Sequence, residues 1–399
     1  MSMKLHKIFF LIPAFLIPFI NSREVSGIPA FARKYQISCQ VCHSPVPRLK
    51  PYGEEFAASG YRMTEYESPR YFINTGDDKL SLLRELPLAV RIDGIASYNG
   101  GNSGRFDFGA PSGVKLISGG ELSDKLSYYF YFFMSEGGEI VGIEDAFLTY
   151  SNIFGTGINI SAGQFQACDP FYKREIRLTL EDIAILTSVP GTSNASLKYE
   201  RGIMADYEIP RLATGIVAEL LNGNGIRNGG EEFLFDKDKY KNLLLYISQP
   251  LGRSFTIGLM GYLGKEVVSG APVTLPSQIK MIGPVIKANF GEHFIINAQY
   301  ILRTDSRIFD ETLGTWGTGI NTQGGYLEAI YTPRSDASKW YFTGLLNWVE
   351  SDYDMLDYRS ATFHVGHVLR RNVRLISEYT YLEGEDKYGK LSLGFVAAF

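Results

Sequence analysis

The sequence predicts a mainly β fold, a transmembrane antiparallel β-barrel of about 16 strands that follows a small α-helical segment. Two regularities and the composition predict this fold. Long segments alternate between apolar and polar residues, and short connections take turns with long ones. Aromatic residues make up 14% of the chain, and 42 of its 399 residues are glycine. This composition is typical of a membrane barrel, in which lipid-facing and lumen-facing residues average out.

Alternation with a period of two residues defines the strands. In the segment 340–348, Trp340 and Leu346 share one face, whereas Thr343 and Asn347 share the other. A soluble β-sandwich is the alternative, but its strands are usually shorter and do not usually carry aromatic residues at both ends of the apolar face. We count about 16 alternating segments, which lie at 86–98, 113–122, 125–134, 142–151, 156–165, 196–207, 210–221, 241–250, 253–263, 278–290, 293–303, 323–333, 338–349, 358–369, 372–383 and 388–399.

The connections between these segments support the same fold. Every second connection is tight, as at 123–124 and 370–371, and the others are longer and rich in Gly, Asn, Asp and Ser. Outer-membrane barrels pair short periplasmic turns with long external loops, so an even number of strands places both termini in the periplasm. The longest connection, 166–195, contains Cys168, to which we assign no role. We expect it to be a solvated external loop rather than a constriction folded into the lumen. The final Phe399 resembles the assembly signal of bacterial outer-membrane proteins.

The N-terminus has the pattern of an export signal over residues 1–27. Lys4 and Lys7 precede an apolar run from residue 8 to residue 20, and small and polar residues follow. A membrane anchor is the alternative, but the run is shorter than the ~20 apolar residues that a spanning helix needs, and prolines interrupt it. We predict cleavage between residues 22 and 27, followed by a small segment at 28–75 and the barrel at 85–399.

The small segment contains the motif Cys39-Gln40-Val41-Cys42-His43. In such a motif the two thiols bond covalently to the vinyl groups of one haem, and the adjacent histidine binds the iron as an axial ligand. The alternatives are a disulfide and half of a zinc site, but zinc would need a second ligand pair that the sequence lacks. The export signal leads to the compartment where c-type haem is attached. The sequence therefore predicts one covalent haem c on Cys39 and Cys42, with His43 on the iron.

The sixth position on the iron has several candidates. Met63 is the only methionine of the small segment, and its thioether would raise the haem potential. Met63 is equally suited to fill a gap between apolar side chains. The position is otherwise open or water-bound, or filled by His364 or His293, which have lumen parity in the barrel. The segment is too short to bury a haem by itself, so we expect the barrel to cover the haem.

Residues around the motif carry a family resemblance. They are Ile28-Pro29-Ala30-Phe31-Ala32-Arg33, Pro47-Arg48-Leu49, Tyr52-Gly53, Phe56 and Gly60-Tyr61-Arg62-Met63. With the haem motif, they resemble the fused cytochrome–porin proteins of the outer membrane, best known as iron-oxidising cytochromes of bacteria. The barrel resembles this family in size, strand number and order rather than in residue motifs.

The resemblance implies an electron conduit in the bacterial outer membrane, with the haem segment entering from the periplasmic side. The haem would accept electrons from an extracellular donor, Fe(II), and pass them to a soluble periplasmic cytochrome. As an enzyme, it would be a ferrous-iron oxidase that transfers electrons and makes no bonds. Outward electron export and a diffusion porin with a haem plug or sensor are the alternatives.

Charge bears on the partners. The formal net charge of −4 indicates no nucleic-acid partner, so the expected partners are the electron donor, the periplasmic cytochrome and membrane lipid. Several carboxylates would attract Fe(II), but any one of them is more often an ordinary solvated charge, and we assign no iron site. These carboxylates are Asp107, Glu144, Asp145, Asp182 and Glu231.

Overall fold

A computed structural model of the whole chain describes residues 30–399, apart from 62, 64–71, 74–75, 78–79, 81, 84–85, 102–103, 227–233, 237, 271 and 385–386. The predicted export signal, residues 1–27, lies outside the described residues, and so does Glu231. Among the residues described, no helix is both long and apolar enough to span a membrane.

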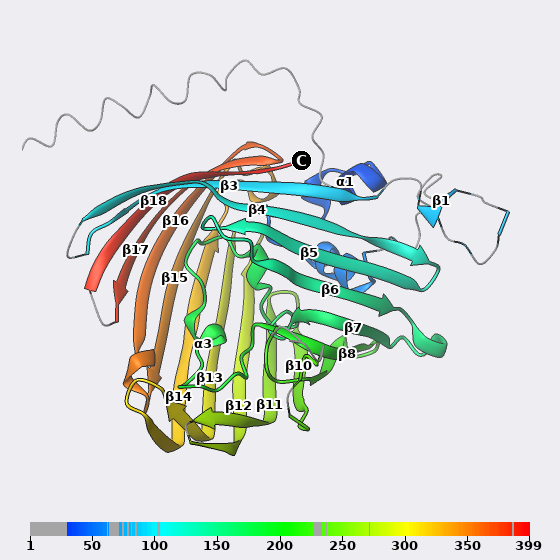
Figure 1. Cartoon of the computed structure of the whole chain (residues 1–399). Coiled ribbons are helices and arrows are strands. Elements are labelled where there is room, and N and C mark those ends of the chain that lie inside the picture. Colours follow the sequence, from blue (N-terminus) through cyan, green and yellow to red (C-terminus); the bar gives the residue numbers. More distant parts are fainter. Residues whose placement is uncertain are drawn as a thin grey trace, which may run out of the picture.

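Within the described residues, 16 strands form one closed antiparallel barrel, in which neighbours along the chain are neighbours in the sheet (Figure 1). The ring closes where β18 pairs with β3, with Leu391 opposite Tyr98 and Ala397 opposite Ile92. The predicted fold class is confirmed. The strands are β3 (Leu88–Asn99), β4 (Arg105–Ser123), β5 (Leu126–Glu136), β6 (Gly142–Tyr150), β7 (Asn159–Gln166), β8 (Tyr199–Ile209), β9 (Thr214–Leu221), β10 (Asn242–Leu251), β11 (Phe255–Gly270), β12 (Val273–Phe290), β13 (Phe294–Asp310), β14 (Thr315–Tyr331), β15 (Trp340–Ser351), β16 (Tyr358–Arg370), β17 (Val373–Glu383) and β18 (Lys387–Ala398).

The outer face of the barrel is apolar and its side chains alternate with inward ones. In β10, Leu243 and Leu245 are exposed on the outside, whereas Leu244 and Tyr246 are buried inside. A continuous apolar outer surface of this extent is typical of a barrel that faces lipid. Its exposed side chains include Ile257, Leu259, Leu263, Ile282, Ile286, Leu302, Leu327, Leu346, Phe363, Leu391, Leu393 and Phe395.

Three connections differ from the sequence prediction because their strands continue further. Segments 99–112, 264–277 and 304–322 were expected to be loops, but β4 already begins at Arg105, β11 and β12 extend to a link at 271–272, and β13 and β14 extend to a link at 311–314. Burial alternates along the extension of β11, where Glu266 and Val268 are buried and Val267 and Ser269 are exposed. The alternation was present in the sequence, although Gly and Ser residues obscured it.

The small N-terminal segment lies at the end of the barrel with the tight turns. It contains α1 (Ala30–Tyr35), the 3-10 helix η3 (Cys39–Val41) and α2 (Pro51–Ala58), and a two-residue hairpin, β1 (Phe72–Ile73) with β2 (Leu82–Leu83), precedes the barrel. The Arg33 guanidinium donates to the Leu88 carbonyl at 2.7 Å, at the first residue of β3. The C-terminus lies beside α1 (Figure 1).

The connection between β7 and β8 folds into the lumen. We call residues 167–198 the lumen loop. It includes η5 (Arg174–Ile176) and α3 (Ala184–Thr187), and α3 lies inside the ring of strands (Figure 1). The prediction of a solvated external loop is therefore wrong.

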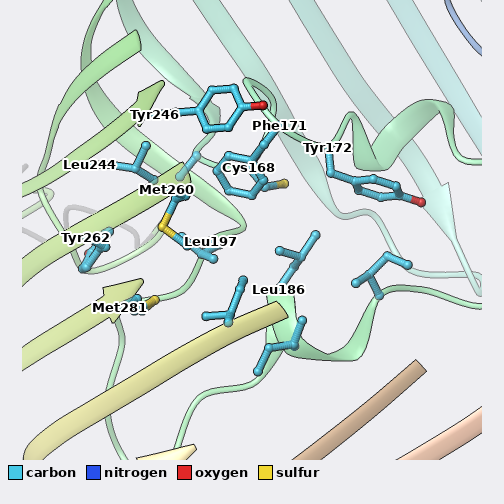
Figure 2. Close-up of a cluster of buried hydrophobic side chains, with 14 of the residues drawn as sticks. Cys168, Phe171, Tyr172, Leu186, Leu197, Leu244, Tyr246, Met260, Tyr262 and Met281 are labelled. Carbon is cyan, nitrogen blue, oxygen red and sulfur yellow. The ribbon is translucent and has the colours of Figure 1, made fainter. Parts of the chain in front are cut away.

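Apolar packing explains why the loop lies inside. The loop side chains Phe171 and Tyr172 contact the inward rings of Tyr246 and Tyr326, with ring centroids 5.6 and 5.0 Å apart. These side chains belong to one buried cluster that fills the lumen on the side of β10 to β15 (Figure 2). Burying this surface outweighs the solvation that an external loop would keep. The strands contribute Phe165, Leu221, Leu244, Tyr246, Met260, Tyr262, Ile279, Met281, Val285, Ile301, Tyr326, Leu345 and Val349, and the loop contributes Ala167, Cys168, Phe171, Tyr172, Ile183, Ile185, Leu186, Ala195 and Leu197.

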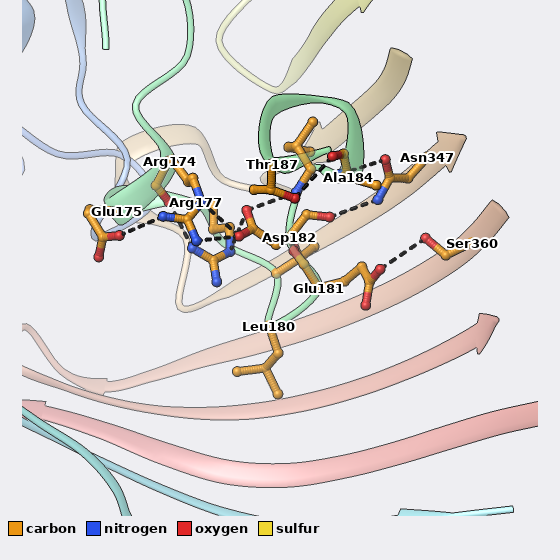
Figure 3. A network of polar contacts seen from close by, with 12 residues as sticks. Arg174, Glu175, Arg177, Leu180, Glu181, Asp182, Ala184, Thr187, Asn347 and Ser360 are labelled. Carbon is orange, nitrogen blue, oxygen red and sulfur yellow. Dashed lines mark hydrogen bonds and ion pairs between the residues drawn. The ribbon is translucent and has the colours of Figure 1, made fainter. Parts of the chain in front are cut away.

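Inward polar side chains fix the backbone of the lumen loop. The backbone N–H groups of Leu180 and Glu181 donate to the Glu378 carboxylate at 2.6 and 2.9 Å. The side-chain amide of Asn347 makes two hydrogen bonds to the loop backbone. It accepts from the Ala184 N–H at 3.1 Å and donates to the Asp182 carbonyl at 2.7 Å (Figure 3). Because these bonds satisfy buried backbone groups, the loop has one defined position in the lumen.

Replacing Glu378 with Ala should loosen this part of the loop. Leaving a buried donor unsatisfied costs about 1–3 kcal/mol, so amide hydrogen exchange at Leu180 and Glu181 should become roughly 5- to 150-fold faster. The matched control is Glu350→Ala, which removes an exposed carboxylate paired with Arg359 and should leave exchange in the loop unchanged. Equal exchange in Glu378→Ala and in the unaltered protein would contradict the anchoring role.

Candidate haem site

The haem motif begins in η3 and continues into a tight turn. The Ser38 hydroxyl accepts from the Gln40 N–H at 3.4 Å at the start of η3, and the His43 N–H donates to the Cys39 carbonyl at 2.9 Å. This local winding brings Cys39, Cys42 and His43 to the wall of the same cavity. Cys39 and Cys42 are half-buried free thiols and are not joined in a disulfide.

The ring of His43 is held in one tautomer. Its Nδ1 lies 2.6 Å from the Pro47 carbonyl oxygen. Because a carbonyl only accepts hydrogen bonds, Nδ1 carries the proton, and Nε2 keeps its lone pair for a metal. Burial lowers the pKa of His43, which keeps the imidazole neutral. A neutral, oriented imidazole with a free Nε2 is what an axial ligand to haem iron requires.

The loop after the motif folds back and supports the histidine. His43 and Leu49 form an antiparallel bridge, and the Lys50 N–H donates to the Cys42 carbonyl at 2.8 Å. Gly53 of α2 packs directly against this turn, since a Cβ there would lie 2.4 Å from the Cys42 carbonyl oxygen. The motif is therefore fixed from both sides by its own segment.

The cavity beside the motif has a volume of about 290 Å³ and lies between the small segment and the barrel. Its wall is mostly apolar on both sides. The small segment contributes Phe31, Ile37, Cys39, Cys42, His43, Val46, Leu49 and Phe56, the barrel contributes Val90, Ile117, Tyr129, Tyr131, Val368, Val396 and four arginines, and the lumen loop contributes Asp169, Lys173, Glu175 and Ile176. The barrel and the lumen loop thus close a space that the small segment could not enclose alone.

Close contacts attach the small segment to the barrel at this cavity. The ring of Tyr61 stacks between Phe31 and Tyr129 of β5, with centroids 5.2 and 4.6 Å away. Gly60 has a φ of +72°, and a Cβ there would lie 2.2 Å from the Ser127 hydroxyl. Only glycine allows this turn to approach the wall so closely.

The donor set fits one c-type haem. Two thiols at the required spacing, a neutral imidazole with Nε2 free, and a largely apolar cavity meet at one place. The cavity also contains the cationic side chains that the carboxylates of such a group would need.

The other predicted iron ligands do not line this cavity. Met63 is half-buried and is not among the lining residues, so its role as sixth ligand stays a prediction. His364 is buried in the lumen as expected, but its Nδ1 bonds the Glu378 carboxylate at 2.9 Å. His293 bonds the Thr332 carbonyl at 3.0 Å through its own Nδ1. Neither histidine lines the cavity.

Sequence reasoning missed the polar residues that the lumen loop brings to the cavity. Asp169, Lys173 and Glu175 lie in the connection that was expected outside, so no strand parity indicated their position. Among the carboxylates considered for Fe(II), Asp145 lines the cavity and Asp182 is paired with Arg174. In the described part of the chain, no group of three or more His, Cys, Asp or Glu side chains could hold a metal ion.

Known proteins resemble this chain in fold and not in sequence. No protein-family model matches the chain, and no curated protein matches it. The anion-selective porin from Comamonas acidovorans superposes with a TM-score of 0.57 at 11% identity, covering 79% of this chain and 99% of that one. The outer membrane channel DcaP of Acinetobacter baumannii gives 0.56 at 12% identity, covering 78% and 96%. Pseudomonas putida OprB gives 0.57 at 10% identity, covering 78% and 94%. The chain therefore has the fold of the 16-stranded outer-membrane porins.

The two motif thiols should react slowly in protein made without attached haem. Burial raises the pKa of both Cys39 and Cys42, so near pH 8 a smaller fraction is thiolate than in a free cysteine with a pKa of about 8.5. Their alkylation rate should therefore keep rising with pH above this value. Cys168 is fully buried and should not react while the protein is folded.

Mass spectrometry after alkylation measures this result. We expect two modified cysteines without haem and none once both motif thiols carry it. A rate that levels off below pH 8, or rapid modification of Cys168, would contradict the burial described here.

Proposed function

We propose that this chain is a haem-carrying barrel of the bacterial outer membrane that transfers electrons across it. One haem c would be bound by Cys39 and Cys42, with His43 as axial ligand to the iron. The observation that carries the proposal is the cavity in which this donor set meets the barrel wall and the lumen loop. The apolar outer face and the porin fold support the membrane location.

The residues of the chain have separable roles in this proposal. The thiols of Cys39 and Cys42 tether the group, and the Pro47 carbonyl orients the imidazole of His43. Apolar side chains such as Val90 and Ile117 exclude water from the cavity. The bound haem would supply a one-electron redox centre. Because the small segment lies at the mouth with the tight turns, a soluble periplasmic cytochrome would accept electrons there.

The external donor is proposed from the sequence resemblance, which favours Fe(II). With the donor outside, insoluble ferric products stay outside as well. Outward electron export would use the same residues in the opposite direction. No dedicated iron site is assigned, since the carboxylates near the cavity are dispersed and partly paired with cations.

A diffusion porin with a haem plug or sensor is the second candidate, and the fold neighbours favour it. Porin lumens are polar and filled with water, which lets solutes pass. In this barrel a cluster of buried apolar side chains occupies part of the lumen, and its inward side chains include Leu244, Met260 and Met281 (Figure 2). The apolar filling and the small segment at the tight-turn mouth favour electron transfer over diffusion.

Replacing both Cys39 and Cys42 with Ser should abolish covalent haem. A haem stain on a denaturing gel should be positive for the unaltered protein and lost completely in the double variant, because no thioether can form. Cys168→Ser is the matched control and should keep the stain, since Cys168 does not line the cavity. A negative stain of the unaltered protein, produced in a cell that attaches c-type haem, would refute the proposal.

Reconstitution into lipid vesicles separates the two candidate functions. An electron conduit should have its haem reduced promptly by Fe(II) supplied at the external mouth and should conduct ions poorly in a planar bilayer. A diffusion porin should pass ions freely whatever the state of the haem. Reduction by dithionite but not by Fe(II) would leave a redox protein with a different donor or the opposite direction of flow.

A further inference from the structure

One wall of the cavity carries several positive charges that have no role in the proposed function. This wall is the hairpin of β16 and β17, from which Arg370, Arg371 and Arg374 line the cavity. We infer that Arg374 binds a carboxylate in this cavity and that, under the proposed function on which this inference rests, the carboxylate is a propionate of the haem. Arg374 would thereby act as a positioning residue that holds this propionate, on a group that Cys39 and Cys42 tether.

Arg374 is buried without a carboxylate partner among the described residues. Its side chain points inward from β17, and the residue is 6% exposed. Its Nη1 donates to the Val46 carbonyl and to the Tyr341 hydroxyl, both at 3.1 Å. These partners are neutral oxygens, and neither compensates the charge.

Three other inward arginines differ from Arg374 in this respect. Arg91 pairs with Asp93 at 2.7 Å, and Arg303 pairs with Asp305 at 2.7 Å. Arg174 of the lumen loop pairs with Asp182 at 2.5 Å. Burying a cation without an anion costs several kcal/mol, so buried charges are normally paired. The exception at Arg374 therefore points to an anion that enters the cavity.

The free donors of Arg374 suit a carboxylate. A guanidinium has five N–H donors, and the two bonds of Arg374 to protein oxygens both come from Nη1. Nε and Nη2 have no hydrogen-bond partner among the described residues, and Arg374 lines the cavity. Two adjacent guanidinium N–H groups match the two oxygens of a carboxylate.

The position of Arg374 connects it to the haem motif. Val46, whose carbonyl it bonds, lies three residues after His43. The acidic lining residues are on other elements, and two of them already have cations: Glu175 lies 3.2 Å from Lys115, and Asp169 lies 3.8 Å from Lys173. A haem has two propionates on the edge opposite to the vinyl groups. The positively charged side chains of the β16–β17 hairpin would attract a propionate that reaches them.

The test is a potentiometric titration of the haem in the intact, haem-loaded protein at fixed pH and low salt. Arg374→Gln should shift the midpoint potential to a more negative value, because the positive charge of Arg374 stabilises the reduced haem and this variant lacks that charge. Arg374→Lys keeps the charge but not the paired donors and should shift the potential less, in the same direction. If Arg374→Gln does not fold, Arg374→Lys carries the test.

Two control variants separate electrostatics from structure. Arg253→Gln removes an exposed charge from the β10–β11 turn, outside the cavity, and should leave the potential unchanged. Tyr341→Phe removes one hydrogen bond of Arg374 but keeps its charge, so it should move the potential less than Arg374→Gln does.

Each outcome decides one question. If Arg374→Gln and the unaltered protein both stain for haem and have the same midpoint potential, this inference is overturned and the proposed function stands. A potential that responds to added acetate in the unaltered protein but not in Arg374→Gln would assign the site to a free carboxylate and overturn the propionate. Absence of any covalent haem would overturn both the inference and the proposed function.

Discussion

The pairing of every backbone N–H and C=O group along the barrel wall is the constraint on which the rest of the structure depends. Hydrocarbon offers these groups no hydrogen bonds, so a sheet that spans a membrane must have no free edge. The pairing of β18 with β3, which lie almost 300 residues apart in sequence, removes the last edge. Closure then gives each side chain one of two environments, with Leu391 and Leu393 outside and Ser392 inside.

Closure also creates an interior that has to be filled or hydrated. In this barrel the lumen loop fills much of it, with its apolar side chains packed against β10 to β15 and its backbone bound by Asn347 and Glu378. On the side of the buried cluster, packed apolar side chains occupy the lumen. The remaining cavity lies at one end, where the lumen loop and the small segment meet.

Two parts of the chain, the small segment and the barrel, form the candidate site and contribute different groups to it. The small segment holds the reactive groups, since η3 and the following turn set the geometry of Cys39, Cys42 and His43. It is too short to enclose them, and the barrel supplies the missing apolar wall and the cationic hairpin with Arg374. Under the proposed function, such an arrangement would let a small segment carry a large prosthetic group, because the barrel provides the burial.

The sequence by itself determined the features that depend on local pattern. Period-two alternation and turn lengths predicted about 16 strands. The same alternation separated Thr343 and Asn347, whose side chains point inward, from Leu346, whose side chain points outward, because a strand has only two faces. The spacing from Cys39 to His43 likewise predicts a covalent haem from five residues alone, and this stays a prediction. Only the tertiary structure decided that the lumen loop lies inside and that Arg374 reaches the cavity without an anion. Both outcomes depend on partners that closure of the barrel brings together from distant parts of the chain, and no local pattern records them.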